Sequence, residues 1–573
     1  DERPPEGADE VAVIDSYLNG SALIEAARSF RADAIHPGYG FLSENAQFAR
    51  AVAEAGLIWV GPPAEAIALM GDKAAARRQA AEHGVPVLPG YDGPAQDDET
   101  LRREAHRIGL PLLIKPSAGG GGKGMRVVRD AAALTDELAA SRREASRAFG
   151  DDRLILERYV DGPRHVEIQV LFDQHGHGVS LGERDCSAQR RQQKIVEEAP
   201  APSVGPELRE RMGQAAVAVA GSVGYVNAGT VEFLLTDAGD FYFLEMNTRL
   251  QVEHPVTELV TGRDLVADQL RIAQGEPLDP TAAYQRLSGH AMEVRLYAED
   301  PEHGFLPATG RLVGVDWPDG VRIDTGVRQG DEIGDRFDPM IAKVIAHGAT
   351  RAEALARLRT ALERTTLLGV RTNLRFLRWL LGQPAMVDGE MRTDTIANLE
   401  LPGPPSIDDA AWRAAARLLQ PMHDSVWGGG WRLNAAPQLR LQHGDEVRSV
   451  DVATTPTRVA VHDRRTGEAF VDVEGQSIDV RIAPPPKVDE AVRQASVATA
   501  GHAMLTAPMP GRVIAVRVAE GASVQEHEPV VVIEAMKMEH AVVSPFAGRV
   551  MRLVAREGAQ VQRGDPLAEV EAT

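Results

Sequence analysis

Short apolar runs alternate with amphipathic segments over the first 280 residues of the chain. Apolar residues recur at helical spacing over residues 22–30, while residues 32–35 and 57–60 are apolar runs that end at Gly/Pro turns. Helices that alternate with such short strands are typical of a parallel α/β layer. We therefore predict an α/β region through residue 280, more strands and turns over 281–350, and one helical stretch over 351–381.

The pattern changes after a proline-rich break at residues 401–406. A helix predicted over 410–419 and several alternating strands follow it, and a proline-led linker begins near residue 483. These breaks predict a multidomain α/β protein. The predicted regions are an amino-terminal α/β domain over 1–70, a second α/β domain over 71–280 with a lid over about 87–158, a third domain over 281–400, a small α+β domain over 401–486, a linker over 487–501 and an all-β domain over 502–573.

The carboxyl-terminal region contains an internal repeat. Residues 508–513 (PMPGRV) recur as residues 545–550 (PFAGRV), and Gly521 recurs as Gly558, each with an offset of 37 residues. Such a repeat predicts two similar β units related by a pseudo-two-fold axis. Lys537 lies between the halves, where an apolar strand ends, and we expect it at the tip of a hairpin. An ordinary exposed turn lysine is the alternative interpretation.

Composition narrows the classes of function. The chain has 573 residues, of which 43% are hydrophobic and 25% charged, and its formal net charge is −21. Proteins whose main partner is nucleic acid carry clustered positive charge, so we expect no such partner. Cys186 is the single cysteine, which excludes an intrachain disulfide and favours a reducing compartment. We find no apolar run long enough to span a bilayer, so we expect no membrane partner.

A strand, a lysine and a glycine-rich loop follow one another over residues 112–125. Four glycines lie between Lys115 and Lys123. Glycines let backbone amides approach phosphate oxygens closely, so this segment is a candidate phosphate site. It is not a Walker A loop, because glycine rather than Ser or Thr follows Lys123. A flexible surface loop is the alternative.

Residues 230–247 have the pattern of a β-hairpin. If Ala238 and Gly239 form a two-residue loop, Glu232 and Glu245 lie directly opposite each other, with Cβ atoms roughly 4.5–5.5 Å apart. Facing carboxylates amid apolar neighbours repel unless a cation lies between them, and oxygen ligands suit Mg²⁺ or Mn²⁺. An exposed, solvated hairpin face would also fit the pattern.

Asn247, Arg249, Gln251 and Glu253 continue the alternation of the second strand. In an extended segment these four side chains point the same way and offer a cation, an amide and a carboxylate to a small anion. Arg249 suits bidentate binding of a planar anion, and Glu253 suits a base. A polar strand face would produce the same alternation. Three further features are unremarkable by themselves: His165, the basic run 189–194 and Arg295.

Together these residues resemble biotin carboxylase, an ATP-grasp ligase. The last domain resembles the biotin carboxyl carrier domain, whose signature is Ala-Met-Lys-Met, here residues 535–538. The combination is similar to the α subunit of a biotin-dependent acyl-CoA carboxylase. It implies an ATP-grasp biotin carboxylase, a small α+β docking domain and an all-β flattened barrel that carries biotin. The matching runs are residues 36–45, 70–73, 112–125, 182–186, 189–194, 196–200 and 245–255.

The resemblance also implies a ligand for each candidate residue. The implied ATP contacts are Lys73, Lys115, Gly120, Gly121, Glu157, His165 and Gln189. The implied ligands of Mg²⁺ or Mn²⁺ are Glu232, Glu245 and Asn247. The implied bicarbonate contacts are Lys194, Arg249, Gln251 and the backbone of Val252.

The family mechanism assigns three further roles. Glu253 would deprotonate bicarbonate, which attacks the γ-phosphate of ATP to give carboxyphosphate. This intermediate decays to CO₂ and phosphate, and the phosphate removes a proton from biotin. Arg295 would stabilise the resulting biotin enolate, and Lys537 would carry the biotin covalently.

The region 401–500 is too short to contain the second half-reaction. A carboxyltransferase barrel of the TIM type needs about 250 residues, so we expect a separate carboxyltransferase β subunit. The resemblance also implies biotin protein ligase as a partner and a hetero-oligomer such as α6β6. The short docking domain favours 3-methylcrotonyl-CoA, a leucine-degradation substrate, over propionyl-CoA, while acetyl-CoA and geranyl-CoA stay open.

Some alternatives remain at this point. A non-catalytic biotin carrier or scaffold is one, and another ATP-grasp ligase is a second, although the second would leave Lys537 unexplained. The expected compartment is the bacterial cytoplasm, or the mitochondrial matrix in a eukaryote. The chain does not begin with Met and lacks the Asn-Arg-Gly-Glu segment with which the family opens, so we expect the domain over 1–70 to be truncated.

Overall fold

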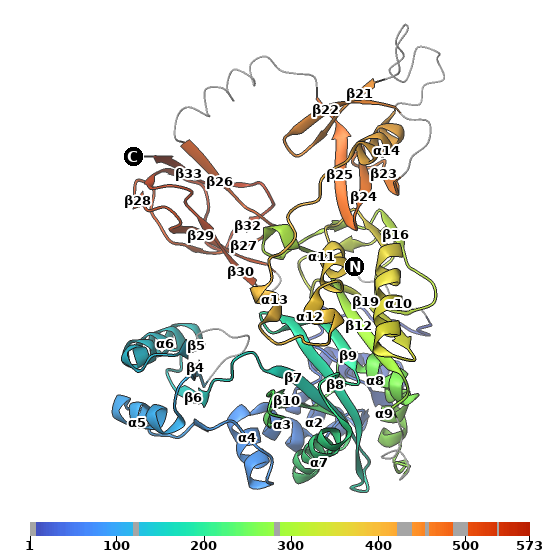
Figure 1. Cartoon of the computed structure of the whole chain (residues 1–573), viewed down its shortest axis with the longest axis vertical. Helices are drawn as coiled ribbons and strands as arrows, with labels where there is room; N and C mark the ends of the chain where they lie inside the picture. Colours follow the sequence, from blue (N-terminus) through green and yellow to red (C-terminus); the bar gives the residue numbers. More distant parts are fainter. Residues whose placement is uncertain are drawn as a thin grey trace. The chain divides into compact units, whose positions relative to one another are not determined.

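The computed structural model describes residues 7–117, 125–279, 287–420, 438–452, 458–484, 502–535 and 538–572 (Figure 1). The chain divides into two compact units. The first comprises Asp1–Val294, Ile345–Leu358 and Gly382–Glu400, and the second comprises Arg295–Val344, Arg359–Leu381 and Leu401–Thr573. Over the described ranges, no helix has both the length and the apolar character needed to cross a membrane.

The amino-terminal layer of the first unit alternates helices with strands, as predicted. β1 and β2 pair in parallel. Asn19 and Asn45 cap the first two helices by accepting hydrogen bonds from backbone amides of the first turn. The elements are α1 (Gly20–Ser29), β1 (Ala34–Ile35), α2 (Ala46–Glu54), β2 (Ile58–Trp59), α3 (Ala64–Gly71) and α4 (Lys73–Glu82).

A small four-stranded sheet with its own core follows. The strands lie in the order β3-β6-β4-β5, and buried side chains such as Leu101, Ile114 and Leu156 fill the space between the sheet and two helices. A separate core allows this segment to fold as a module. Its elements are β3 (Gly90–Tyr91), α5 (Asp98–Ile108), β4 (Leu112–Pro116), β5 (Arg126–Val128), α6 (Leu134–Phe149) and β6 (Leu154–Arg158).

A larger antiparallel sheet carries the candidate site. Six neighbouring strands lie in the order β11-β10-β7-β8-β9-β12. On β7, Val166, Ile168 and Val170 pack in one core with α7, so the alternate residues of the strand face the other side of the sheet. The elements are β7 (Arg164–Phe172), β8 (Gly178–Arg190), β9 (Gln193–Ala199), α7 (Pro206–Ser222), β10 (Asn227–Leu235), β11 (Phe241–Asn247), α8 (His254–Thr261), α9 (Leu265–Ala273) and β12 (His290–Tyr297).

The predicted helical stretch over 351–381 is wrong in its middle. The structure has two helices, α10 (Arg351–Arg364) and α11 (Leu374–Leu380), separated by the strand β20 (Thr366–Leu368), which pairs with β16. Two adjacent threonines precede Leu367, and β-branched residues favour a strand at this point. The neighbouring elements are β13 (Glu299–Asp300), β14 (Leu306–Pro307), β15 (Gly310–Arg311), β16 (Gly314–Asp316), β17 (Arg322–Thr325), β18 (Glu332–Ile333), β19 (Met340–Gly348), α12 (Pro384–Val387) and α13 (Thr395–Asn398).

A small α+β domain follows, as predicted. The helix α14 (Asp409–Leu419) packs on a five-stranded antiparallel sheet of order β22-β21-β25-β24-β23. Trp412 and a row of helix alanines fill the core between them. The strands are β21 (Gln438–His443), β22 (Glu446–Asp451), β23 (Ala460–Asp463), β24 (Glu468–Val473) and β25 (Gln476–Ile482).

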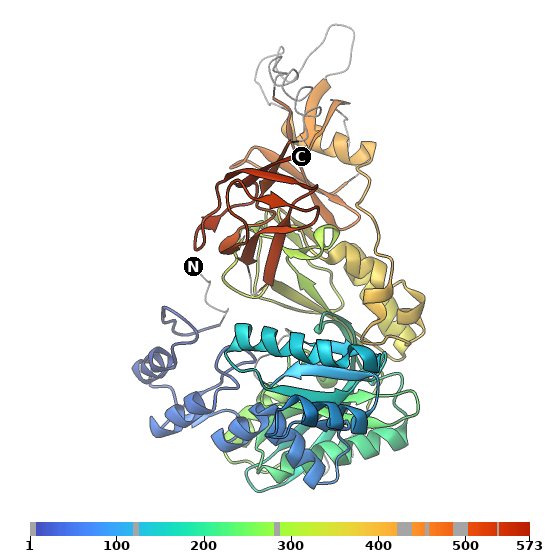
Figure 2. The ribbon, with the colours of Figure 1, turned by 90° about the vertical axis from the view of Figure 1, so that its left-hand side faces the viewer.

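The last domain is all-β, and its repeat is confirmed. Two four-stranded sheets, of order β26-β33-β31-β28 and β30-β29-β27-β32, enclose one core, and Figure 2 shows this domain in red. The strands β27 and β31, β28 and β32, and β29 and β33 are related by the 37-residue offset and occupy opposite sheets. The strands are β26 (His502–Thr506), β27 (Gly511–Val516), β28 (Ser523–Val524), β29 (Pro529–Ala535), β30 (Met538–Val543), β31 (Gly548–Leu553), β32 (Gln560–Val561) and β33 (Pro566–Ala572).

Candidate functional site

The hairpin of β10 and β11 places Glu232 directly opposite Glu245, as predicted. The predicted two-residue loop is wrong, however. A backbone hydrogen bond of 2.9 Å closes a three-residue loop, 237–239, in which Gly239 has a φ of 80°. Three-residue hairpin loops favour glycine at this left-handed position. A bulge at Leu244 then shifts the register by one residue and restores the predicted pair, so the two deviations cancel.

The segment after β11 is not extended, contrary to the prediction. The strand ends at Asn247, the chain turns, and α8 begins with Glu253 as its N-cap residue. The side chains still meet, because Arg249 Nη1 donates to Gln251 Oε1 (3.0 Å) and Arg249 Nη2 donates to Asn247 Oδ1 (3.2 Å). The turn gathers polar groups that an extended strand would have spread into a row.

Lys194, at the start of β9, lies at the centre of the site. Its ammonium donates to Glu167 Oε2 (2.6 Å), Glu253 Oε1 (2.6 Å) and Glu232 Oε1 (3.0 Å). An ammonium has three hydrogens, so these three carboxylates use all of its donors. All three carboxylates are buried, and Glu167 and Glu253 have no exposed surface. Because buried charges need partners, Lys194 and the carboxylates stabilise one another.

These charges shift the pKa values of the cluster. Burial alone would lower the pKa of Lys194, but Cys186 and the three carboxylates outweigh it and hold the pKa well above its usual value. Burial alone would raise the pKa of Glu232, but Lys194 and His165 bring it well below its usual value. The Glu232 carboxylate and the Lys194 ammonium are therefore both charged near neutral pH.

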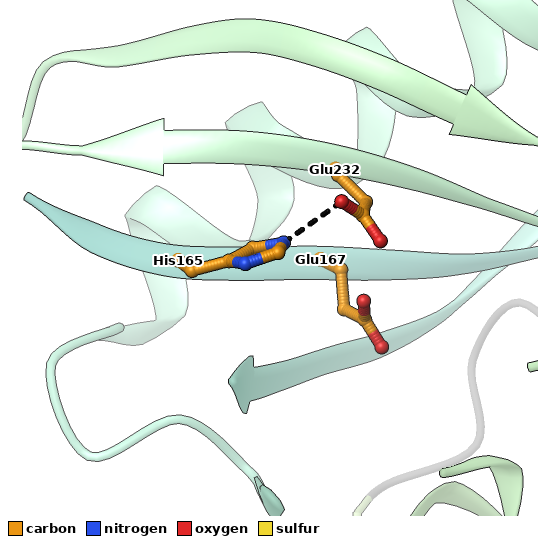
Figure 3. A group of neighbouring side chains, drawn as sticks. All are labelled: His165, Glu167 and Glu232. Carbon is orange, nitrogen blue, oxygen red and sulfur yellow. Dashed lines mark ion pairs between the residues drawn. The ribbon is translucent and has the colours of Figure 1, made fainter. Parts of the chain in front are cut away.

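His165 and Glu167 lie on the same strand, next to the strand of Glu232, and the His165 ring points toward the Glu232 carboxylate (Figure 3). His165 Nε2 lies 3.0 Å from Glu232 Oε2. Burial would lower the pKa of His165, but the Glu232 charge outweighs it, so the pKa is raised. Gln189 Nε2 lies 3.3 Å from His165 Nδ1, on the side of the ring away from Glu232. One ligand atom from each of His165, Glu167 and Glu232 lies within 4.8 Å of the others.

The other predicted cations form separate ion pairs. Lys115, on β4, donates to Glu157 Oε2 (2.6 Å), and Arg77, on α4, donates to the other oxygen of the same carboxylate (2.9 Å). Lys73, the first residue of α4, lies 3.2 Å from Glu245 Oε2. Both lysines thus lie at carboxylates that sequence analysis had also selected.

The remaining predicted residues lie in the second unit, in the turn before α8 or outside the described part of the chain. Arg295 belongs to the second unit, where its carbonyl accepts a hydrogen bond from Asn373 Nδ2 (3.0 Å). Val252 is half-buried in the turn before α8. Three predicted residues lie outside the part of the chain that the structure describes: Gly120, Gly121 and Lys537.

Sequence reasoning missed three residues of the site: Glu44, Glu167 and Arg184. Glu44 Oε2 accepts from Arg249 Nε (3.0 Å), and Arg184 Nε donates to Glu167 Oε1 (2.5 Å). The alternation of β7 could have indicated Glu167, because it shares a face with His165. No comparable pattern marks Glu44, whose contact with Arg249 joins segments 205 residues apart.

Comparisons with known proteins identify four domains in the chain. Residues 6–67 match the biotin carboxylase N-terminal domain, residues 72–281 the ATP-binding domain of the carbamoyl-phosphate synthase L chain, residues 293–398 the biotin carboxylase C-terminal domain and residues 503–570 the biotin-requiring enzyme domain. The mitochondrial methylcrotonoyl-CoA carboxylase subunit alpha of Dictyostelium discoideum is 40% identical over 93% of this chain and 84% of its own length. The chain belongs to the family of biotin-dependent acyl-CoA carboxylase α subunits.

Other relatives of this α subunit support the same assignment. The human mitochondrial propionyl-CoA carboxylase alpha chain is 40% identical over 92% of this chain and 80% of its own length. The biotin carboxylase domain of Hydrogenobacter thermophilus 2-oxoglutarate carboxylase, solved with MgADP and bicarbonate, superposes with a TM-score of 0.64 at 43% identity. It covers 68% of this chain and 86% of the solved domain.

A second solved structure is similar in extent. The biotin carboxylase of Campylobacter jejuni, solved as a β,γ-ATP complex, has a TM-score of 0.64 at 40% identity and covers 67% of this chain and 86% of the solved chain. The chain is therefore an ATP-dependent ligase, a biotin carboxylase joined to a biotin carrier domain. This confirms the predicted ATP-grasp fold class and the predicted cofactors, ATP, magnesium and biotin.

Proposed function

We propose that the cluster around Lys194 is the carboxylation site, and that biotin on Lys537 is its acceptor. One observation carries the proposal: the Lys194 ammonium lies within 3.0 Å of both Glu232, a candidate metal ligand, and Glu253, a candidate base. An anion bound at Lys194 would then lie between a metal-bound phosphate and the group that removes its proton. This juxtaposition is what an attack of bicarbonate on ATP needs.

Bicarbonate would exchange for part of the existing ion pairs. Lys194 and Arg249 would supply positive charge to bicarbonate, and Gln251 would supply an amide. The backbone of Val252 is the fourth proposed contact. Glu253 accepts the bicarbonate proton, and the freed oxygen attacks the γ-phosphorus of ATP while the bond to ADP breaks. Lys194 must release Glu253 as the anion enters, which leaves that carboxylate free to act as a base.

The residues present fit a divalent cation. Glu232 and Glu245 face each other across the hairpin, so carboxylate oxygens gather at one place. Asn247 lies beside them: its Nδ2 donates to Glu232 Oε1 (2.9 Å), and its Oδ1 accepts from Arg249. Hard cations such as Mg²⁺ and Mn²⁺ prefer such oxygen donors. A bound cation would neutralise the charge of the transferring phosphate. Lys73, beside Glu245, and Lys115, beside Glu157, extend the positive charge toward the nucleotide.

The biotin site and the partner are proposed on similar grounds. β29 and β30 pair as far as Ala535 with Met538, so only Met536 and Lys537 lie between the two strands. This topology fits a modified lysine on a tight connection, which biotin protein ligase would load. A separate carboxyltransferase β subunit would take the carboxyl group, because residues 401–500 are too few for a barrel of about 250 residues, and residues 401–486 are the proposed docking domain.

The proposed acyl substrate is 3-methylcrotonyl-CoA. The methylcrotonoyl-CoA carboxylase α subunits of Dictyostelium discoideum and Arabidopsis thaliana are 40% and 39% identical to this chain, and the short docking domain favours the same type. The propionyl-CoA enzyme is equally similar at 40% identity, so propionyl-CoA is the second candidate. These relatives are mitochondrial, and Lys537 would present biotin to the same kind of partner in either case.

The test is acyl-CoA carboxylation by the chain together with its native β subunit. 3-Methylcrotonyl-, propionyl-, acetyl- and geranyl-CoA are compared, with ATP and bicarbonate present. A preference for 3-methylcrotonyl-CoA supports the proposed substrate, and any other preference overturns it. ADP release by the chain alone is measured in parallel. If ADP release does not depend on bicarbonate, the site is not a carboxylation site, and a non-catalytic biotin carrier or scaffold is favoured.

A further inference from the structure

A buried arginine lies beneath the site and contacts none of the residues proposed to bind substrate. Arg184, on β8, has no exposed surface. Its Nε donates to Glu167 Oε1 (2.5 Å), Nη1 donates to Gln169 Oε1 (2.8 Å) and Thr257 Oγ1 (2.9 Å), and Nη2 donates to Thr230 Oγ1 (3.1 Å). The planar guanidinium is thus bonded at all three nitrogens.

The partners of Arg184 come from the elements that carry the site. Glu167 lies on β7. Thr230 lies two residues before Glu232 on β10, so the two share a face of the strand. Thr257 lies one helical turn after Glu253, the N-cap residue of α8. The guanidinium therefore joins the three backbone segments that hold the carboxylates around Lys194.

Arg184 acts on Lys194 through a shared carboxylate. One oxygen of Glu167 accepts from Arg184 Nε, and the other accepts from Lys194 Nζ at 2.6 Å. A carboxylate held at both oxygens cannot rotate without breaking one of the two ion pairs. Arg184 therefore orients the Glu167 carboxylate, and this carboxylate in turn orients the ammonium of Lys194.

The charges support the same conclusion. Glu167, Glu232 and Glu253 together carry three negative charges, and Lys194 balances one of them. Arg184 balances a second charge in a fully buried position, where an uncompensated carboxylate is strongly unfavourable. Without Arg184 the site would repel an incoming anion more strongly.

We propose that Arg184 is a positioning residue for bicarbonate: through Glu167 it directs the ammonium of Lys194, and through Thr257 it holds the helix start that bears Glu253. This inference rests on the proposed function. The alternative is an ion pair that contributes to folding and has no influence on bicarbonate.

The test compares Arg184→Lys with a matched control in the full-length, biotinylated chain. Lysine keeps the charge but cannot bond four acceptors, so kcat/KM for bicarbonate falls roughly 10- to 100-fold, while KM for ATP stays within about twofold. The control is Arg209→Lys. Arg209 donates two hydrogen bonds of 2.6 Å to the carboxylate of Glu183, a buried residue that directly precedes Arg184 in the sequence. Neither Arg209 nor Glu183 contacts the Lys194 cluster, and the control retains parent kinetics.

A second pair of variants separates positioning from folding. If Arg184 acts largely through Glu167, the loss in the double variant Arg184→Lys with Glu167→Gln is smaller than the product of the two single losses, whereas independent effects would multiply. Thr257→Val removes a single contact at nearly constant shape and raises KM for bicarbonate by roughly 2- to 10-fold. This variant carries the test if Arg184→Lys does not fold.

Three results would overturn the proposal. They are equal losses for ATP and bicarbonate in Arg184→Lys, multiplicative effects in the double variant, and parent kinetics in Thr257→Val. The parent chain distinguishes this failure from that of the proposed function. If its own ADP release is independent of bicarbonate, the proposed function fails, and the inference fails with it.

Discussion

The ammonium of Lys194 lies 2.6 Å from the carboxylate of Glu253, so the proposed anion-binding cation and the proposed base neutralise each other. Neither group is fully available until something separates them. An entering bicarbonate can do so, because it offers Lys194 another negative partner and leaves Glu253 free to accept a proton. The site would thus gain its base only when its substrate is present.

Replacing Lys194 with Gln should abolish activity and destabilise the carboxylase domain. Removing one partner of a buried ion pair costs about 3–5 kcal/mol, and here three carboxylates lose their common cation. Urea unfolding measures the stability, and bicarbonate-dependent ADP release measures the activity. The stability control is Lys73→Gln: the Lys73 side chain is 60% exposed, so its ion pair adds less than about 1 kcal/mol. Equal stability of the two variants would contradict the cluster.

Replacing Glu232 with Gln should lower the pKa of His165. Burial lowers that pKa and the Glu232 charge raises it, so a neutral amide at position 232 removes the main opposition to burial. Histidine ring signals followed by NMR between pH 5 and 8 report the change. The same variant should bind Mn²⁺ roughly 10- to 100-fold more weakly, as measured by electron paramagnetic resonance. Unchanged Mn²⁺ affinity would remove Glu232 from the metal site.

Asp185 should make the protein less stable as the pH rises from 4 to 7. Burial and the facing Glu198 raise the pKa of Asp185 from 3.8 to about 6. In this interval the folded state binds more protons than the unfolded state, so the free energy of unfolding falls with rising pH. The loss, complete above about pH 7, is on the order of 3 kcal/mol.

The test of this pH dependence is Asp185→Asn. An amide cannot ionise, so the variant should match the parent near pH 4 and exceed its stability at pH 8. Three other charged or titratable groups surround Asp185 and Glu198. Arg164 acts on Asp185, and His290 and Arg351 both form ion pairs with Glu198. Urea midpoints between pH 4 and 8 measure the difference, and Asp319→Asn, at an exposed turn, should follow the parent. Parallel curves for parent and Asp185→Asn would refute the shift.

The composition of the site could be predicted only in part. Alternation within a strand shows which residues share a face, and this placed Glu232 with Glu245 and gathered the polar residues after β11. It does not show which strands are neighbours. Lys194 meets Glu167 and Glu232 because β7, β8, β9 and β10 lie side by side, and it meets Glu253 because the chain turns into α8 after β11.

Local irregularities were the other source of error. The loop 237–239 and the bulge at Leu244 are backbone choices that a pattern of apolar and polar residues does not encode. The strand β20 was missed because Leu355, Leu358 and Leu362 recur at helical spacing in the preceding helix, and the predicted helix was extended past its end. The multidomain α/β class and the repeat were predictable because both depend on long-range periodicity, which tolerates a misplaced turn. The ATP-grasp fold was implied by the resemblance to biotin carboxylase.

Replacing Gly475 with Ala should destabilise the small α+β domain and disturb its packing against Arg378 of α11. Gly475 has a φ of 95°, and a Cβ there would lie 2.8 Å from Arg378 Cζ. Arg378 has little room to move, because it donates to the carbonyls of Leu362 (2.9 Å) and Thr365 (3.0 Å). We expect a loss of about 1–3 kcal/mol from strain, plus the clash. Gly467→Ala isolates the strain, since Gly467 has a φ of 77° and open space around it. Equal thermal midpoints of the two variants would exclude the clash.

Replacing Lys537 with Ala should uncouple the two half-reactions, carboxylation of biotin and carboxylation of acyl-CoA. The proposed carboxylation site lies in the first unit, on side chains that do not include Lys537, so carboxylation of added free biotin should persist. Transfer to acyl-CoA needs biotin that is covalently carried between two active sites, so acyl-CoA carboxylation should fall to background. Scintillation counting of ¹⁴C-bicarbonate incorporation measures both reactions in the same preparation. Arg556→Ala, at an exposed position of the same domain, should retain both activities. If the Lys537→Ala variant still carboxylates acyl-CoA, biotin is attached elsewhere or is not the carrier.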